Sequence, residues 1–149
     1  MKELTTIFAA IATLALTACA MIAPLPSATP SGPRTIVLDG EAVTEEDAGG
    51  FVSWVCEDFV YGGRILVEVG FFGDPSFEGL GFILYDGGYS GELTYYRRTG
   101  LEHRWDWGPN ENDYAFVIQT DGTGLYYDLS TVPTGKSAKA NNVYQCHRR

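Results

Sequence analysis

The chain has few positive charges and few of the side chains that usually carry out catalysis. Ten Lys and Arg stand against nineteen Asp and Glu, so 149 residues carry a formal net charge of −9. This excess of acid argues against nucleic-acid binding, because phosphate contacts need a surplus of cations. Histidine occurs only at His103 and His147, and we find no cofactor motif and no metal-ligand spacing. We therefore expect no nucleic-acid partner, no cofactor, no bound metal and no enzyme activity.

Long apolar runs are also scarce, and the clearest one lies at the start of the chain. Leu4 to Ala18 is too short for a comfortable bilayer span but suits a secretory signal. The segment Leu16-Thr17-Ala18-Cys19 that ends this run resembles the lipobox of bacterial lipoproteins. The resemblance implies that residues 1–18 are a lipoprotein signal peptide and that Cys19 carries the lipid after cleavage.

Two other interpretations of the N-terminus stay open. Ala18-Cys19-Ala20 also fits the small-x-small cleavage pattern that would release a soluble periplasmic protein, and an uncleaved membrane anchor is the third possibility. Several acyl chains give stable anchoring where one binds only marginally. Because Ala20 is not the aspartate associated with inner-membrane retention, we expect secretion across the inner membrane and lipid anchoring at the periplasmic face of the outer membrane.

Cysteine is rare, and the odd count of three is informative. If Cys19 carries lipid, Cys56 and Cys146 remain as an even pair in an oxidising compartment. With no Cys-x-x-Cys motif, we expect a structural disulfide between them. Residues 19–33 hold the lipidated cysteine and a segment with four prolines, which predicts an extended tether ahead of one domain over residues 34–149.

Glycine and aromatic residues are abundant in that domain. Turn signals recur every few residues between short β-branched and aromatic runs, which is typical of a meander or small barrel. We predict an all-β fold: a small antiparallel β-barrel or sandwich of about eight strands with one disulfide. Residues 41–48 are interpreted as a helical turn or a loop. The candidate strand segments are 35–38, 51–60, 64–72, 80–85, 92–98, 101–107, 114–120, 123–129 and 142–147.

Two hairpin registers follow if each turn has two residues. An Asp121-Gly122 turn would place Phe116 opposite Tyr127, together with the pairs Ile118–Leu125 and Tyr114–Leu129. A Thr99-Gly100 turn would place Tyr96 opposite His103 and Arg97 opposite Glu102. In both hairpins we expect aromatic side chains inside and charged ones outside, with Trp105 and Trp107 in the core rather than on a carbohydrate platform. Strand 64–72 is apolar on both faces, which indicates a position deep in the sheet.

Several short segments resemble the family of membrane-bound inhibitors of c-type lysozyme. They are Trp54-Val55-Cys56, Ser90-Gly91-Glu92-Leu93-Thr94-Tyr95, Trp105-Asp106-Trp107-Gly108 and Asn141-Asn142-Val143-Tyr144-Gln145-Cys146. The resemblance implies an antiparallel β-barrel on a lipid anchor, and a loop serine, here Ser90, that enters the enzyme's active cleft. Trp107-Gly108-Pro109 lacks the lysine that the family carries there, and the nearest cations lie on the preceding hairpin.

We expect a non-enzymatic binding domain on a membrane-anchored envelope lipoprotein, and lysozyme inhibition is the most specific version of this hypothesis. The membrane is one partner and a basic protein such as lysozyme the other, because an acidic chain attracts basic partners. A carrier of a small apolar ligand and a purely structural lipoprotein are the alternatives, and a weak enzyme at Glu102, His103 and Asp106 ranks last. The oligomeric state stays open. The candidate binding residues are Ser90, Tyr95, Arg97, Arg98, Glu102 and Arg104.

Overall fold

Short apolar runs between glycine-rich turns produce an all-β fold, as the sequence predicts. The computed structural model describes residues 32–58, 65–110 and 112–149, so the predicted signal peptide, Cys19 and most of the predicted tether lie outside the described residues. Across those ranges we find no helix long and apolar enough to cross a bilayer. The strands are β1 Thr35–Leu38, β2 Glu41–Thr44, β3 Phe51–Asp58, β4 Ile65–Phe72, β5 Glu78–Tyr85, β6 Ser90–Thr99, β7 Glu102–Trp107, β8 Tyr114–Ile118, β9 Thr123–Asp128 and β10 Asn142–Arg148.

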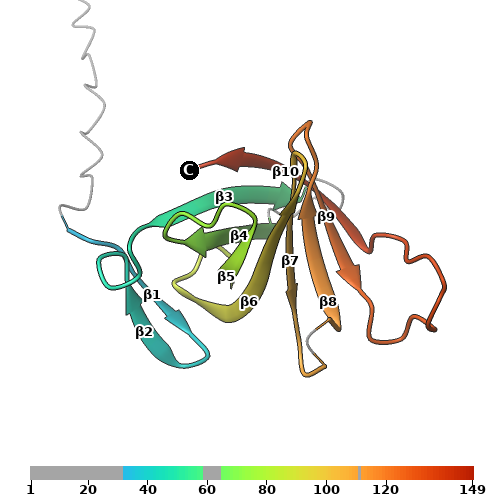
Figure 1. Ribbon diagram of the computed structural model, residues 1–149, viewed down its shortest axis with the longest axis horizontal. Helices are drawn as coiled ribbons and strands as arrows, with labels where there is room; N and C mark the ends of the chain where they lie inside the picture. Colours follow the sequence, from blue (N-terminus) through green and yellow to red (C-terminus); the bar gives the residue numbers. More distant parts are fainter. Residues whose placement is uncertain (1–31, 59–64, 111) are drawn as a thin grey trace, which may run out of the picture. The chain divides into compact units, whose positions relative to one another are not determined.

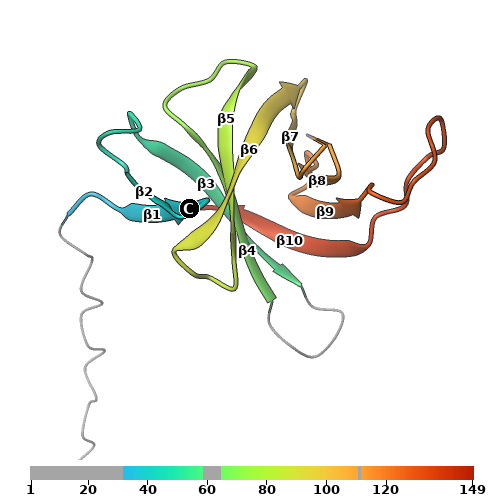
Figure 2. The same cartoon turned by 90° about the horizontal axis from the view of Figure 1, so that it is seen from below.

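The eight strands β3 to β10 form a closed antiparallel barrel (Figures 1 and 2). Each pairs with its neighbour in the chain, β10 returns to β3, and the pairing of β6 with β7 makes the ring continuous. The expected barrel is confirmed. β4 lies between β3 and β5, and Phe72 on its outer face packs against the cluster of Ile36, Leu38, Phe82 and Leu84, which accounts for an apolar residue outside the barrel.

The β1–β2 hairpin is an addition to the barrel, and the expectation of a helical turn or loop at residues 41–48 is wrong at its start. Asp39 and Gly40 have positive φ angles of 50° and 88°, the combination that a tight two-residue hairpin turn requires. The turn pairs Glu41–Thr44 with β1, and β1 then joins β6 in parallel. Ile36 and Leu38 of this hairpin pack on the outer side of the barrel against Phe82 and Leu84.

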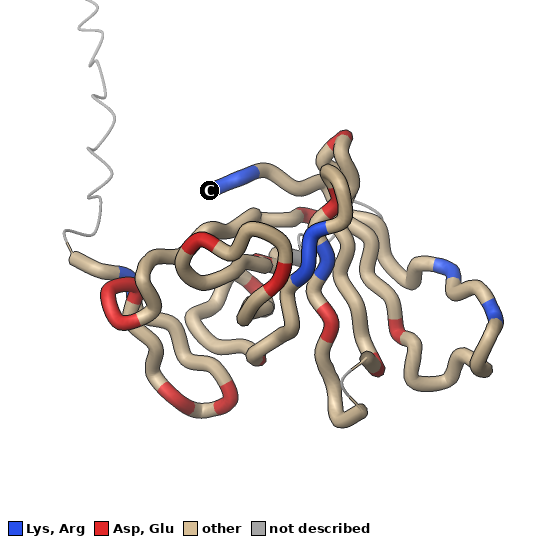
Figure 3. The backbone as a smooth tube through the Cα atoms, viewed as in Figure 1, with Lys and Arg blue, Asp and Glu red and all other residues tan. Residues whose placement is uncertain are grey.

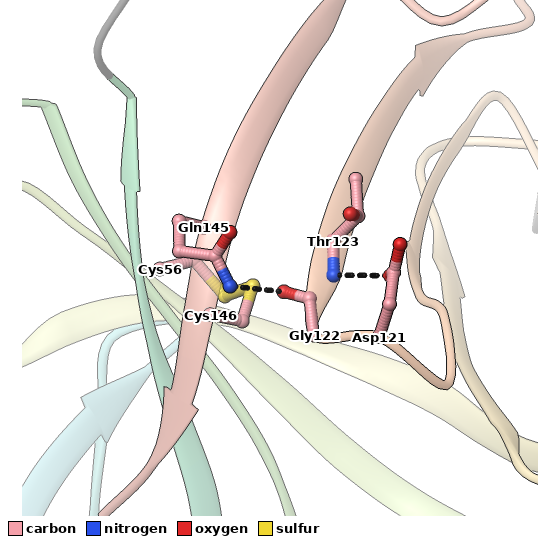
Figure 4. The surroundings of a disulfide bond; sticks show 6 residues. All are labelled: Cys56, Asp121, Gly122, Thr123, Gln145 and Cys146. Atoms are coloured by element: carbon pink, nitrogen blue, oxygen red, sulfur yellow. Dashed lines mark hydrogen bonds between the residues drawn. A yellow bond between two sulfur atoms is a disulfide. The ribbon is translucent and has the colours of Figure 1, made fainter.

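The β8–β9 register differs by one residue from the predicted one. Phe116 pairs with Tyr126 rather than with Tyr127, so Leu125 and Tyr127 lie on the opposite face from Phe116, and the single apolar face expected for this hairpin is wrong for β9. The reason is a three-residue loop: Gln119 N donates to Thr123 O at 2.9 Å, and Gly122 takes a φ of 85° to close the turn (Figure 4).

The β6–β7 register differs by two residues, so that Tyr96 pairs with Trp105 and Arg97 with Arg104 instead of Glu102. Gly100, with a φ of 62°, and Leu101 make the turn. Because side chains alternate with a period of two, this shift leaves every residue on its expected face. Trp105 and Trp107 are accordingly buried, as predicted for core residues.

The barrel interior is filled largely by aromatic side chains. Trp105 is fully buried and donates its indole N–H to the carbonyl of Gly70 at 2.7 Å, which satisfies the polar atom inside the core. The Cys56–Cys146 disulfide joins register partners on β3 and β10, as expected, and lies beside the β8–β9 turn (Figure 4). A Cβ on Gly124 would lie 2.6 Å from Cys146 Sγ, so glycine at this position makes room for the bond.

Candidate binding cleft on the outer face of β6 and β7

A hollow of about 640 Å³ opens where the pairing of β6 with β7 ends. The last paired residues on this side are Tyr95 and Asp106. Beyond them the start of β6 pairs with β1 instead, so the two strands leave space between them. We call this hollow the outer cleft; its lining residues are Leu80, Leu93, Thr94, Tyr95, Arg97, Asp106, Trp107, Gly108 and Asn112.

Asp106 is the polar anchor of the outer cleft. Its residue surface is only 2% exposed although strand alternation places it on the outer face. The guanidinium of Arg104 contacts both carboxylate oxygens, with its Nη2 at 2.6 Å from Oδ1, and Arg97 Nη2 lies 3.2 Å from Oδ2. Two cations thus cover one buried carboxylate, which holds both arginine side chains in place.

Apolar side chains flank this charged cluster and remain exposed. Leu80, Leu93 and Tyr95 are 63%, 42% and 46% exposed, and Leu80 and Tyr95 are register partners on β5 and β6. The Tyr95 hydroxyl donates a hydrogen bond to Glu78, and this bond is the main cause that raises the pKa of Tyr95. The result is an exposed apolar strip beside a fixed ionic cluster.

Thr94 is a lining residue whose hydroxyl is buried and unsatisfied. The residue is 4% exposed, and its hydroxyl has no hydrogen-bond partner among the described residues. A buried hydroxyl without a partner is costly, and it usually indicates that water or a bound group completes its bonding. Thr94 alternates with the exposed Leu93 and Tyr95, and its hydroxyl faces the barrel interior: a Cβ on Gly81 would lie 2.7 Å from both Thr94 Oγ1 and Trp105 Cδ1. The hydroxyl therefore belongs to the interior and is not offered to an occupant of the outer cleft.

The structure distributes the six predicted binding residues over three places. Tyr95 and Arg97 line the outer cleft, and Arg104 reaches it through Asp106. Ser90 is exposed at the start of β6, where it pairs with Val37, outside that lining. Arg98 and Glu102 lie at the other end of β6 and β7, where Arg98 lines a second, smaller hollow.

His103 belongs to the interior, as its place in the alternating pattern suggests. Its Nδ1 lies 2.8 Å from the hydroxyl of Tyr96. Burial is the main cause that lowers the pKa of His103, with Arg98 and Arg148 adding to it, so the neutral ring is favoured. Glu102, His103 and Asp106 do not converge, because Asp106 is bound to arginines on the opposite face of β7.

Sequence reasoning missed the cleft residues Leu80, Leu93 and Asn112. The first two are ordinary strand leucines whose exposure depends on what covers the sheet, and their pattern carries no sign of it. Asp106 offered a partial signal, because Arg104 stands two residues before it on the same strand face.

Comparisons with known proteins supply no relative for the chain. No protein-family model, no curated protein and no solved structure matches it. In the part of the chain that the structure describes, no three His, Cys, Asp or Glu side chains gather as metal ligands would. A function for the outer cleft therefore has to come from its own residues.

Proposed function

We propose that this chain is an envelope lipoprotein whose barrel binds a protein partner through the outer cleft without catalysis. Cys19 would carry the lipid that holds it at the periplasmic face of the outer membrane. The observation that carries the proposal is the exposed strip of Leu80, Leu93 and Tyr95 beside the Arg97–Asp106–Arg104 cluster. Exposed apolar patches bordered by polar groups are typical of interaction sites.

The residue types in the outer cleft suit a protein interface. Tyrosine and arginine are the side chains that most often dominate binding energy, and both occur here next to leucines. Because Asp106 already holds Arg97 and Arg104, little conformational freedom remains to be lost on binding.

Charge favours a basic partner, and c-type lysozyme is the specific candidate. The net charge of −9 would steer a cationic protein toward the chain, more strongly at low salt. Figure 3 shows acidic residues on the β1–β2 turn and at the ends of β8 and β9. Ser90 starts β6 and Gly108 follows β7. In an antiparallel pair these positions lie at the same end of the barrel as the outer cleft, and the resemblance implies contact residues there.

The test measures lysozyme activity with the purified full chain in nonionic detergent at low and high salt. We expect inhibition that weakens as salt rises. Replacing Tyr95→Ala should weaken binding about tenfold or more, because it removes a central aromatic anchor. Val143→Ala is the matched control, since Val143 is a similarly exposed apolar residue on β10 and should have no effect. Unchanged lysozyme activity at low salt would exclude lysozyme as the partner.

The two alternatives gain less support. A carrier of an apolar ligand needs interior space, but the core positions of the barrel hold buried side chains such as Trp105, Tyr96 and Phe116. A purely structural lipoprotein would have no use for an exposed strip beside a fixed ionic cluster. If Tyr95→Ala changed no binding to envelope proteins, the structural alternative would be preferred.

A further inference from the structure

The opposite end of the β6–β7 hairpin carries a second hollow, of about 320 Å³, that the proposed function does not use. It lies at the mouth of the barrel near the Gly100-Leu101 turn and the β8–β9 turn. We call it the cationic mouth. Its functional side chains are Trp54, Arg98, His103, Gln119, Thr120 and Arg148.

Four of these residues form a continuous row across the mouth. Arg98 and His103 are register partners on β6 and β7. The rings of His103 and Trp54 have centroids 4.5 Å apart, which links β7 to β3. The guanidinium carbon of Arg148, on β10, lies 5.9 Å from the centroid of the Trp54 ring, in a cation–π contact. The row therefore places a guanidinium at each end of a pair of aromatic rings, whose planes are inclined at 46°.

Neither arginine at the ends of the row is neutralised by a described carboxylate. The ion pairs that the structure describes use Arg34, Arg97, Arg104 and Arg149. Arg98 instead donates its Nε–H to the carbonyl of Gly100 at 3.0 Å, which leaves its terminal nitrogens directed elsewhere. No Asp or Glu is among the residues that line this hollow. Two uncompensated cations in one hollow contrast with the net acidity of the chain.

The neutral groups around the two arginines are donors that suit an anion. Burial favours the neutral form of His103, whose Nδ1 is hydrogen-bonded to the Tyr96 hydroxyl. Gln119 and Thr120, which carry an amide and a hydroxyl, are also lining residues. Arginine forks bind phosphate and carboxylate oxygens in pairs, and phosphate offers more oxygens for two forks to share.

We propose that the cationic mouth binds the phosphate group of a small organic anion. Arg98 and Arg148 bind the phosphate oxygens, Gln119 and Thr120 donate to the oxygens that remain, and the face of Trp54 packs against the apolar part of the ligand. The phosphate can belong to a soluble metabolite or to a lipid headgroup, since both present the same oxyanion. The site lies at the other end of the β6–β7 hairpin from Ser90 and Gly108, so it does not depend on the outer cleft binding a protein.

The test titrates the full chain with phenyl phosphate and follows the indole N–H of Trp54 by two-dimensional NMR, with affinity from calorimetry. We expect Arg98→Gln and Arg148→Gln each to weaken binding about tenfold, since each removes a charged hydrogen-bond donor. The matched controls are Lys136→Gln and Lys139→Gln, which remove the same charge from the exposed segment between β9 and β10. These controls should change affinity by about twofold or less.

A second arm separates the two sources of phosphate. The full chain is placed in nonionic micelles containing phosphatidylglycerol, with phosphatidylcholine micelles for comparison, and the same Trp54 signal is followed. Arginine-dependent shifts with phenyl phosphate support a soluble ligand, and shifts seen only with phosphatidylglycerol support a lipid headgroup. The proposal is overturned if neither arm shifts the signal, or if the lysine variants weaken binding as much as the arginine variants do.

Discussion

Glu68 is a buried carboxylate on the outer side of β4, and it joins two distant parts of the chain. Arg34, just before β1, contacts its two oxygens at 2.5 and 2.7 Å, and Arg149, just after β10, contacts Oε2 at 2.9 Å. Burial raises the pKa of Glu68, but hydrogen bonds from Arg34 and Ser53 and the two arginine charges outweigh it, so the pKa falls below its ordinary value of 4.5. The ionised form is therefore the one that the fold stabilises.

Replacing Glu68→Gln should lower the free energy of unfolding by about 3 kcal/mol, because it leaves Arg34 partly buried without its counter-charge. Because the folded pKa is depressed, this carboxylate stabilises the protein above about pH 4.5 and loses its contribution as the pH falls through the folded value. Urea unfolding of the full chain across this range tests both effects. Glu46→Gln, at an exposed position, is the control. Equal stability of the Glu68 and Glu46 variants at neutral pH would contradict the assignment.

At the residue scale, sequence predicts which face the side chains of β6 and β7 take but not whether that face is covered, and for β9 the predicted face is wrong. Asp106 alternates with Trp105 and Trp107 and so falls outside, as the pattern indicates. Its burial comes from Arg97 and Arg104, of which Arg97 belongs to the neighbouring strand. Arg98 and Arg148 likewise share a hollow only because the barrel closes. Contacts of this kind join side chains on different strands. They depend on the register between the strands, which the sequence predicts with errors of one or two residues.

At the element scale, β6 is the strand on which the arrangement depends. It pairs with β5 along its length, with β1 at its start and with β7 at its end. Gly91 stands where β1 and β5 both approach: an added Cβ would lie 1.7 Å from the carbonyl oxygen of Ile83 and 2.9 Å from Leu84 Cα. Only glycine allows this approach, since both neighbours are backbone atoms.

We expect Gly91→Ala to lower the free energy of unfolding by about 3 kcal/mol or more, because β5 and β6 must move apart. Gly32→Ala is the matched control, because a Cβ there meets nothing within 4 Å. Urea unfolding followed by tryptophan fluorescence measures the difference between the two variants. If the Gly91→Ala protein were as stable as the Gly32→Ala protein, β6 would tolerate a side chain at position 91, and the prediction would be contradicted.

The errors in register also belong to the element scale. Each hairpin was predicted around a two-residue turn, whereas Gly122 closes a three-residue loop and Gly100 begins its turn instead of ending it. A glycine in the sequence indicates that a turn is near, but its φ depends on the twist of the strands that it joins. The β1–β2 hairpin was missed for a related reason: four-residue strands carry too short a pattern to recognise.

At the scale of the whole molecule, the predicted Cys56–Cys146 disulfide closes a loop that spans most of the domain. Cys56 and Cys146 are 90 residues apart in sequence and are buried next to Gly124. They are register partners on β10 and β3, so the bond joins two strands that backbone pairing already holds together. Its effect is expected mainly on the unfolded chain, whose freedom it restricts.

Replacing both residues, Cys56→Ala with Cys146→Ala, should lower the free energy of unfolding by about 4–5 kcal/mol on the chain-entropy account of a loop this long. Wild-type chain in reducing agent should unfold at nearly the same urea concentration as the variant, which serves as the control. Non-reducing peptide mapping checks the link directly. Recovery of Cys56 and Cys146 in separate peptides from oxidised protein would contradict the pairing.

The sequence by itself determined the all-β class, the pairing of the two cysteines and the inward or outward face of most strand residues. These properties follow from local alternation, from turn composition and from the two cysteines that remain in the domain when Cys19 is set aside, which need no knowledge of distant contacts. Only the tertiary structure decided the register, the covering hairpin, the outer cleft and the cationic mouth. Each of these depends on which strands become neighbours when the ring closes, and that choice minimises exposed backbone and apolar surface over the whole chain.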